Sequence, residues 1–316
     1  MWRIAPAIAA RAVHVRRSAA ERDLQVDEKH EMASPFHTAL PAARRSQPEP
    51  RSNLPTGFRL GSIVGIEIRM DASVLVIGLL IAVNLATGLL PAWHPAWPRA
   101  LVWFVALVAA LLFFASILAH ELSHALVGRH YGLPVRRITL FIFGGMAELE
   151  REPDRPKVEL LTAAAGPALS IVLGVAATLM GALLGRAELG RIPDSDDLHR
   201  LGPITTLLMW LGPVNVMLGL FNLIPGFPLD GGRVLRAVLW WKTKRLESAT
   251  RWATRAGQVV AAALVVSGIL MIFGHRVPFL GEGFGQGIWL VLIGWFLNAA
   301  ALRSYAQTVW KMRQAP

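Results

Sequence analysis

The chain has 316 residues, of which 54% are hydrophobic and only 17% are charged, and its mean hydropathy is +0.46. A soluble domain carries about 25% charged residues, so this composition argues against a soluble protein and favours one that lies in a bilayer. The chain contains no cysteine, which excludes disulfides, thiolate metal sites and a cysteine nucleophile. The formal net charge of +11 suggests either nucleic acid or anionic lipid as a partner.

Residues 1–56 differ in composition from the rest of the chain. They are rich in Arg, Ala, Pro and Ser and contain no long apolar run, so we do not expect a secretory signal peptide there. We predict a disordered basic tail, although a translation start assigned too far upstream would explain the composition equally well. Residues 57–316 are predicted to form one membrane domain.

Six apolar segments beyond residue 70 are long enough to cross a hydrocarbon core of about 30 Å. The predicted fold class is therefore an all-α polytopic membrane protein with about six transmembrane helices and a short membrane-associated β-hairpin or sheet. The segments lie at about residues 71–91, 100–128, 157–185, 204–224, 256–274 and 286–303.

Basic residues predict how these segments are oriented. The connections after the second and fourth segments and the C-terminal tail are rich in Arg and Lys, whereas the opposite connections are poor in them or contain balancing acids. We therefore expect both termini on the cytoplasmic side of the cell membrane, with the charges facing the lipid bilayer and no nucleic acid bound. Trp93 and Trp97 fit an outer aromatic belt, and His94 is expected to be solvated.

The second apolar segment contains His120-Glu121-Leu122-Ser123-His124, which matches the pattern H-E-x-x-H. Residues four apart share a helix face, so both imidazoles can point at one ion, and Glu121 is offset so that it can reach a metal-bound water. Zinc lowers the pKa of that water to about 7, and the carboxylate can take its proton. Because ionisable residues are costly inside a membrane, we predict a metal site and not merely a polar helix face.

Two other segments are not typical of membrane helices. Ile138–Phe143 is β-branched and aromatic and precedes Gly144 and Gly145, which predicts a short strand and a turn. Residues 223–232 contain two Pro and three Gly, so no regular helix can persist there. Broken backbone at membrane depth is tolerated only against protein or a water-filled cavity, and an intramembrane active site needs such a cavity.

A catalytic zinc usually has three protein ligands, so two His leave one ligand to be found. The candidate is Asp230, which follows the break in the helix. It fits equally well as the N-cap of a helix over residues 233–241, because capping and ligation use the same oxygens. Charge patterns place His120 and Asp230 near the same membrane face, which supports ligation.

The chain resembles the site-two protease family of intramembrane zinc metalloproteases over about residues 57–310. The resemblance implies one Zn²⁺ per chain on His120, His124 and Asp230, with Glu121 as the base. It implies hydrolysis of peptide bonds in or near the transmembrane helix of a membrane-protein substrate, as in regulated intramembrane proteolysis. The passages that carry it, in matching order and spacing, are Phe114–His124, Phe143–Ala147 and Asn222–Arg233.

The resemblance also implies substrate-binding residues. Asn222 would contact the substrate or polarise its carbonyl, and an Asn that bonds free carbonyls at a helix break is the alternative. Gly144 and Gly145 would belong to a sheet whose edge pairs with an extended substrate, and a simple amphipathic linker is the alternative. A further family-like passage, Ala164–Ser170, is interpreted as helix packing through small residues. Many members carry paired nucleotide-sensing domains after the last span, and we expect this chain to be a form without them.

Two other functions fit parts of the pattern. A membrane zinc protease that processes prenylated proteins would be expected to supply a Glu on a later helix as third ligand, and no such helix fits near the cytoplasmic side. A transporter or non-catalytic metal-binding membrane protein also uses broken helices. Glu121 beside the metal and the lack of repeated halves argue against that function.

Overall fold

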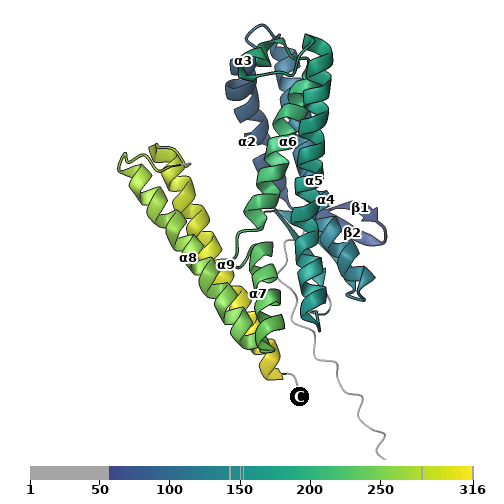
Figure 1. Ribbon diagram of the computed structural model, residues 1–316, viewed down its shortest axis with the longest axis vertical. Coiled ribbons are helices and arrows are strands. Elements are labelled where there is room, and N and C mark those ends of the chain that lie inside the picture. Colours follow the sequence, from purple (N-terminus) through teal and green to yellow (C-terminus); the bar gives the residue numbers. More distant parts are fainter. Residues whose placement is uncertain (1–56, 142–143, 150, 152, 279, 315–316) are drawn as a thin grey trace, which may run out of the picture. The chain divides into compact units, whose positions relative to one another are not determined.

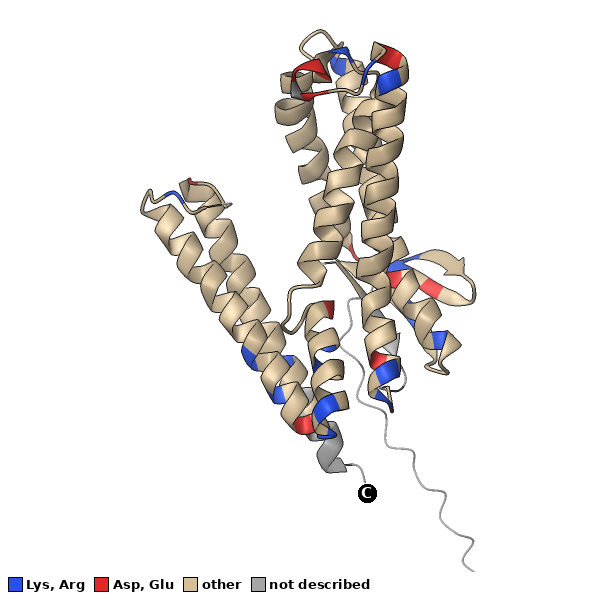
Figure 2. Cartoon of the chain, viewed as in Figure 1, with Lys and Arg blue, Asp and Glu red and all other residues tan. Residues whose placement is uncertain are grey.

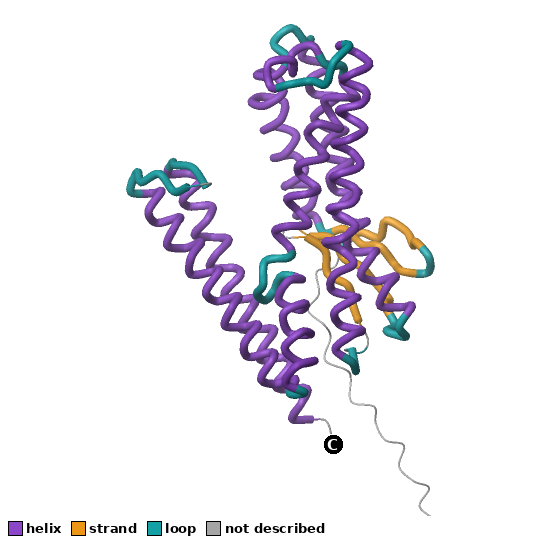
Figure 3. Tube along the Cα trace, viewed as in Figure 1, coloured by secondary structure: helices purple, strands orange, loops and turns teal. Residues whose placement is uncertain are grey.

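The computed structural model describes residues 57–141, 144–149, 151, 153–278 and 280–314. The predicted tail over residues 1–56 lies outside the described residues, as do Ile142 and Phe143 at the end of the predicted strand. Residues 54–316 group into one unit, and its described part is mostly helical with one small sheet (Figures 1 and 3).

Among the described residues, six helical segments are long and apolar enough to cross a membrane, and this confirms the predicted fold class. Only 22% to 33% of the most apolar part of each segment is buried inside the protein, so an apolar solvent must cover the rest. Figure 2 shows these helices almost free of charge along their middles, with charged residues near their ends. The segments are α2–η1–α3 (Ala72–Asn84, Leu85–Leu89 and Leu90–Trp93), α4 (Arg99–His130), α5 (Pro156–Leu189), α6 (Pro203–Asn222), α8 (Leu246–Ile272) and the first part of α9 (Phe284–Gln314).

Helix α8 begins about ten residues before the predicted span. Its first turns contain Glu247, Arg251 and Arg255, so hydropathy alone does not mark them as helix. Glu247 accepts a hydrogen bond from Arg251 at 2.9 Å across one helical turn, which supports an exposed helical start. A short helix, α7 (Asp230–Thr243), precedes it, and a 3₁₀ segment, η2 (Ser195–Arg200), joins α5 to α6.

Within the described part of the chain, the sheet has four strands in the order β1-β2-β3-β4. Strands β1 (Phe58–Ile63) and β2 (Ile66–Met70) are antiparallel, β2 and β3 (Val135–Phe141) are parallel, and β3 and β4 (Gly144–Leu149) are antiparallel. The predicted strand is thus present as β3. Gly144 and Gly145 begin β4 and do not form the predicted turn, because their backbone pairs with the end of β3.

The sheet packs against α4 and so sets the rotation of that helix. Buried Ile66 and Ile138 of the sheet belong to one hydrophobic cluster with Ala125 of α4, and Leu118 and Leu122 pack against that cluster. Residues four apart share a helix face and residues two apart lie on opposite sides. The face of α4 that carries Leu118 and Leu122 is therefore turned towards the sheet. The opposite face, which carries His120 and His124, is turned away from it.

The predicted break between α6 and α7 is confirmed (Figure 3). Helix α7 starts directly against the loop before it, and this close approach requires glycine. A Cβ on Gly231 would lie 2.3 Å from the carbonyl oxygens of Leu223 and Ile224, and one on Gly232 would lie 2.4 Å from Gly226 C. The first turn of α7 is therefore held at a fixed place beside the loop.

The prediction that His94 is solvated was wrong. The residue is only 1% exposed, its ring stacks on Trp97 at 3.7 Å between centroids, and its Nε2 lies 2.9 Å from Thr206 Oγ1. Burial lowers the pKa of His94, so the ring stays neutral in this site. The hydrogen-bond partner comes from α6, more than a hundred positions away, which no local pattern could indicate.

Candidate metal centre

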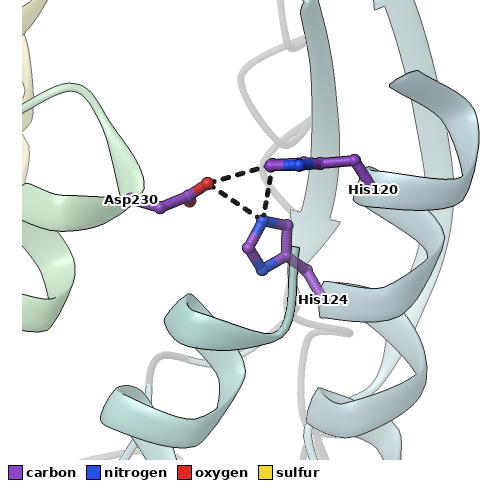
Figure 4. Close-up of side chains that lie close together, drawn as sticks. All are labelled: His120, His124 and Asp230. Carbon is purple, nitrogen blue, oxygen red and sulfur yellow. Dashed lines mark hydrogen bonds and ion pairs between the residues drawn. The ribbon is translucent and has the colours of Figure 1, made fainter. Parts of the chain in front are cut away.

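Three side chains from two helices meet at one point: His120 and His124 from α4, and Asp230 from α7 (Figure 4). Asp230 Oδ2 lies 3.1 Å from Nε2 of each imidazole, and the two Nε2 atoms are 3.2 Å apart. Tetrahedral zinc with bonds of about 2.0–2.1 Å places its ligand atoms about 3.3 Å apart. The triangle therefore has the size of one face of a zinc site.

The chemistry of these three atoms also fits a cation. Thr162 O accepts a hydrogen bond from His124 Nδ1 at 2.7 Å, so a neutral His124 turns the lone pair of Nε2 towards Asp230. His120 Nδ1 is likewise engaged, by Ser170 Oγ at 2.9 Å. Neutral imidazoles would then direct lone pairs at each other and at the carboxylate. A positive charge among them removes this repulsion, so the residues present fit zinc.

Helix α5 supplies both partners that orient the imidazoles. Metal-binding histidines commonly use their second ring nitrogen in this way, which sets both tautomer and ring orientation. Ser170 is 0% exposed and Thr162 is 1% exposed, so neither exchanges its partner with bulk water. Asp230 is less enclosed, and although burial raises the pKa of its carboxyl, the two imidazoles outweigh that effect and hold the pKa below its usual range. Asp230 is therefore an anionic ligand candidate.

Helix α5 also approaches the centre through Gly166. A Cβ at this position would lie 2.2 Å from His124 Nε2 and 2.6 Å from His120 Nε2. A side chain here would occupy the space in front of the two nitrogens. Sequence reasoning assigned this passage to helix packing alone and missed Thr162, Gly166 and Ser170 as parts of the site. The available signal was the family-like passage Ala164–Ser170 itself.

Glu121 lies beside the metal centre and against strand β4. A Cβ on Gly145 would lie 2.2 Å from Glu121 Cγ and 2.7 Å from its Cδ. A side chain at position 145 would therefore displace the carboxylate. The glycine that sequence reasoning linked to substrate binding is also needed to make room for the candidate base.

A cavity of about 720 Å³ opens next to these residues, and its lining is mainly apolar. Helix α9 contributes one wall, with Trp289, Ile293 and Phe296, none of which was singled out from the sequence. The seven site residues predicted from the sequence all line this cavity: His120, Glu121, His124, Gly144, Gly145, Asn222 and Asp230.

Asn222 is the last residue of α6 and faces this cavity. Its side-chain nitrogen donates to Leu218 O at 2.9 Å, one turn back in the same helix. Leu218 O is not one of the last four carbonyls of α6, so this hydrogen bond does not decide between the two roles considered for Asn222. A role towards substrate is compatible with its place in the cavity and stays a prediction.

Comparison with known proteins assigns the chain to a family. The model of Peptidase family M50 matches residues 108–192 and 191–266, so the first match contains His120 and His124 and the second contains Asp230. The chain belongs to peptidase family M50. The site-two protease resemblance is thereby confirmed, and the relatives described next are named zinc metalloproteases.

Two M50 relatives show how far the likeness extends. "Putative zinc metalloprotease Rip3" of Mycobacterium tuberculosis is 38% identical over 242 residues, which is 77% of this chain and 57% of the relative. "Putative zinc metalloprotease sll0528" of Synechocystis sp. is 37% identical over 258 residues, which is 81% of this chain and 62% of the relative. The chain thus spans less than two thirds of the length of these M50 proteins.

One solved structure is also similar. "Site-2 Protease from Methanocaldococcus jannaschii" is 26% identical to this chain, with a TM-score of 0.49. The match covers 79% of this chain and 95% of that structure.

Proposed function

We propose that this M50 chain is an intramembrane zinc metalloendopeptidase that hydrolyses peptide bonds in or near the transmembrane segments of membrane proteins. The observation that carries the proposal is the triangle of two imidazole nitrogens and one carboxylate oxygen, 3.1 to 3.2 Å on a side. The two imidazoles belong to α4, a helix apolar enough to span a membrane. Placing ionisable groups in a membrane costs free energy, so their presence there indicates a functional site.

In the proposed mechanism, His120, His124 and Asp230 hold the zinc ion and Glu121 moves the proton. Zinc, when bound, supplies a Lewis acid that makes water a nucleophile near neutral pH. Glu121 accepts a proton from the attacking water while the oxygen of that water adds to the scissile carbonyl carbon. The same carboxyl then donates this proton to the leaving nitrogen as the C–N bond breaks. The apolar lining of the cavity suits an apolar substrate segment, and its polar residues lie where the attacking water is needed.

The edge of the sheet supports binding of an extended substrate. Among the described residues, strand β4 is the last strand in the sheet order and pairs with β3 on one side only. A substrate strand added to β4 would place its backbone beside Gly145 and therefore beside Glu121. Because peptide bonds inside a helix are shielded, a transmembrane substrate must first unwind to bind in this way. Gly144 and Asn222, which line the same cavity, are assigned to substrate binding on this basis.

The proposed location is the cell membrane, with both termini in the cytoplasm and cleavage near the cytoplasmic face. Support comes from the basic residues on α7, the helix that begins with Asp230, and at the start of α8. Figure 2 shows Lys and Arg gathered where these two helices meet. Positive residues gather on the cytoplasmic side of membrane proteins.

Replacing Glu121 with Gln tests the mechanism. The variant should bind zinc like the wild-type protein but cleave a model single-span membrane substrate about 10²- to 10⁴-fold more slowly, because it lacks a general base. Zinc content by elemental analysis and cleavage in proteoliposomes are the two measurements. Full activity of the variant would remove Glu121 from the mechanism.

Replacing Asp230 with Ala tests the metal centre separately. This variant should lose zinc together with activity, because two imidazoles alone leave the metal one protein ligand short. Treating the wild-type protein with a chelator should abolish cleavage, and added zinc should restore it. Unchanged zinc content in the Asp230 variant would favour a protease with a different third ligand. Zinc binding without any cleavage by the wild-type protein would favour a metal-binding membrane protein.

A further inference from the structure

A buried ion pair joins α5 to α7 outside the cavity. Glu159 is 1% exposed and Arg236 is 6% exposed. Arg236 Nε donates to Glu159 Oε1 at 2.6 Å, and a terminal nitrogen of the same guanidinium contacts this oxygen as well. Removing two charges from water is costly, and a well-packed apolar pair is often as stable or more stable. A contribution to stability therefore does not by itself explain this pair.

The carboxylate of this pair continues a stripe on α5 that serves the metal centre. Glu159, Thr162, Gly166 and Ser170 are spaced by three, four and four residues, so they share one face of the helix. Thr162 and Ser170 bond the two imidazoles, and Gly166 leaves space in front of their Nε2 atoms. Glu159 is the one member of the stripe that bonds to α7, the helix that begins with Asp230.

The guanidinium of the pair reaches the segment that leads into Asp230. Its central carbon lies 5.3 Å from the centre of the Phe227 ring, in the loop between α6 and α7. Arg236 therefore bonds α5 through its nitrogens and covers the loop through its planar face. A lysine could not make both contacts, because its ammonium lacks the planar fork and stacks less well on an aromatic ring.

We propose that Glu159 and Arg236 are positioning residues of the metal centre. The pair sets the separation and rotation of α7 against α5, and thereby the distance from Asp230 Oδ2 to the two imidazole nitrogens. Asp230 needs such support because the close contacts of Gly231 and Gly232 fix the start of α7 to the loop and not to α5, and its N-cap residue, Leu229, makes no side-chain capping bond. This inference rests on the proposed function, in which His120, His124 and Asp230 hold zinc.

The test compares zinc affinity in variants of the full-length protein, purified in detergent micelles and titrated against a chromophoric chelator. The variants are Arg236→Met, Glu159→Gln and the double variant Glu159→Met with Arg236→Met. Glu247→Gln is the matched control, since it breaks an exposed Glu–Arg pair of 2.9 Å on α8. We expect the first three to bind zinc about 10- to 100-fold more weakly, as for other groups that orient metal ligands, and the control to bind like wild type.

The double variant separates positioning from packing. An apolar pair should restore thermal stability close to that of the wild-type protein, while zinc affinity stays reduced and the visible absorption of the Co²⁺-substituted protein differs from wild type. Wild-type zinc affinity and an unchanged Co²⁺ spectrum in the double variant would overturn the proposal, even if Arg236→Met alone does not fold. Failure of the proposed function would look different, because Asp230→Ala would then retain zinc.

Discussion

At the scale of single residues, the metal centre depends on which ring nitrogen of each histidine is free. Thr162 O and Ser170 Oγ hold the Nδ1 atoms, and they lie 38 and 50 positions from their histidines in the chain. The H-E-x-x-H spacing places both rings on one side of α4, but it does not orient them. The orientation of the two rings comes from residues of α5, and two predictions follow from this.

Ser170→Ala should weaken zinc binding about 10- to 100-fold, because His120 loses the partner that orients its ring. Ser116→Ala is the matched control, since Ser116 is also buried, in α4, but its hydroxyl bonds Leu112 O in its own helix. Zinc affinity of both purified variants can be measured by chelator competition. Equal affinity of Ser170→Ala and wild type would show that His120 is oriented by something else.

Gly166→Ala should abolish zinc binding or reduce it at least about 10-fold. The added methyl group would lie 2.2 Å from His124 Nε2, so the imidazoles must move apart. Gly88→Ala is the control, because a Cβ there meets nothing within 4 Å. Elemental analysis of the purified proteins gives the zinc content. Full zinc occupancy in Gly166→Ala would contradict the proposed position of the ion.

At the scale of elements, the sheet connects the start of the membrane domain to α4. Glu67 on the inner strand β2 accepts a hydrogen bond from Arg69 at 3.0 Å and lies within 3.7 Å of Arg59 on β1 and Arg137 on β3. The hydrogen bond from Arg69 and the attraction of the neighbouring arginines lower the pKa of Glu67, against a smaller effect of burial. One carboxylate therefore links three strands.

The lowered pKa of Glu67 predicts a pH-dependent contribution to stability. The ionised form is favoured in the folded protein, so the contribution is present above the pKa of about 4.3 of an unfolded Glu. It is lost as the pH falls through the lower pKa of the folded state. Wild type should therefore melt at a higher temperature than Glu67→Gln near pH 7, and the gap should close below about pH 4. A gap that is constant with pH would contradict this account.

At the scale of the whole membrane domain, the cavity is assembled from elements far apart in the chain. Helices α4, α6, α7 and α9 and strand β4 all contribute residues to its lining. Gly145 on β4 and Asp230 after the helix break line the cavity, and apolar residues of α9 line a further side. The proposed orientation in the membrane then decides from which side this cavity meets water.

The orientation can be tested because the chain has no cysteine. Single cysteines at Arg200 and Arg276 should react with a membrane-impermeant maleimide in intact cells, since both residues are exposed and follow spans that end on the proposed outer side. Lys244→Cys, in the exposed connection between α7 and α8, should react only after permeabilisation. The reverse pattern would place both termini outside and overturn the proposed topology.

The sequence by itself determined the spans, the break before Asp230 and the shared helix face of the two imidazoles, whereas it left Asp230 open between metal ligand and N-cap until the family resemblance was considered. Each of these features is a local property of the chain: hydropathy over about twenty residues, Pro and Gly within ten residues, and imidazoles four positions apart. None of them depends on contacts with distant residues. The strand β3 was also visible from its β-branched and aromatic composition. The early start of α8 was not visible from the sequence, because hydropathy does not identify a helical segment that contains several charged residues.

Only the tertiary structure decided which residues support the metal triangle. Strands β1 and β2, the burial of His94 and the buried pair of Glu159 with Arg236 all depend on partners distant in the chain. The distance from Asp230 to the imidazoles depends in the same way on how α7 packs against α5. The physical reason is that folding brings together the neighbours that orient a lone pair and position a ligand. The spacing of residues along one helix carries no information about those neighbours.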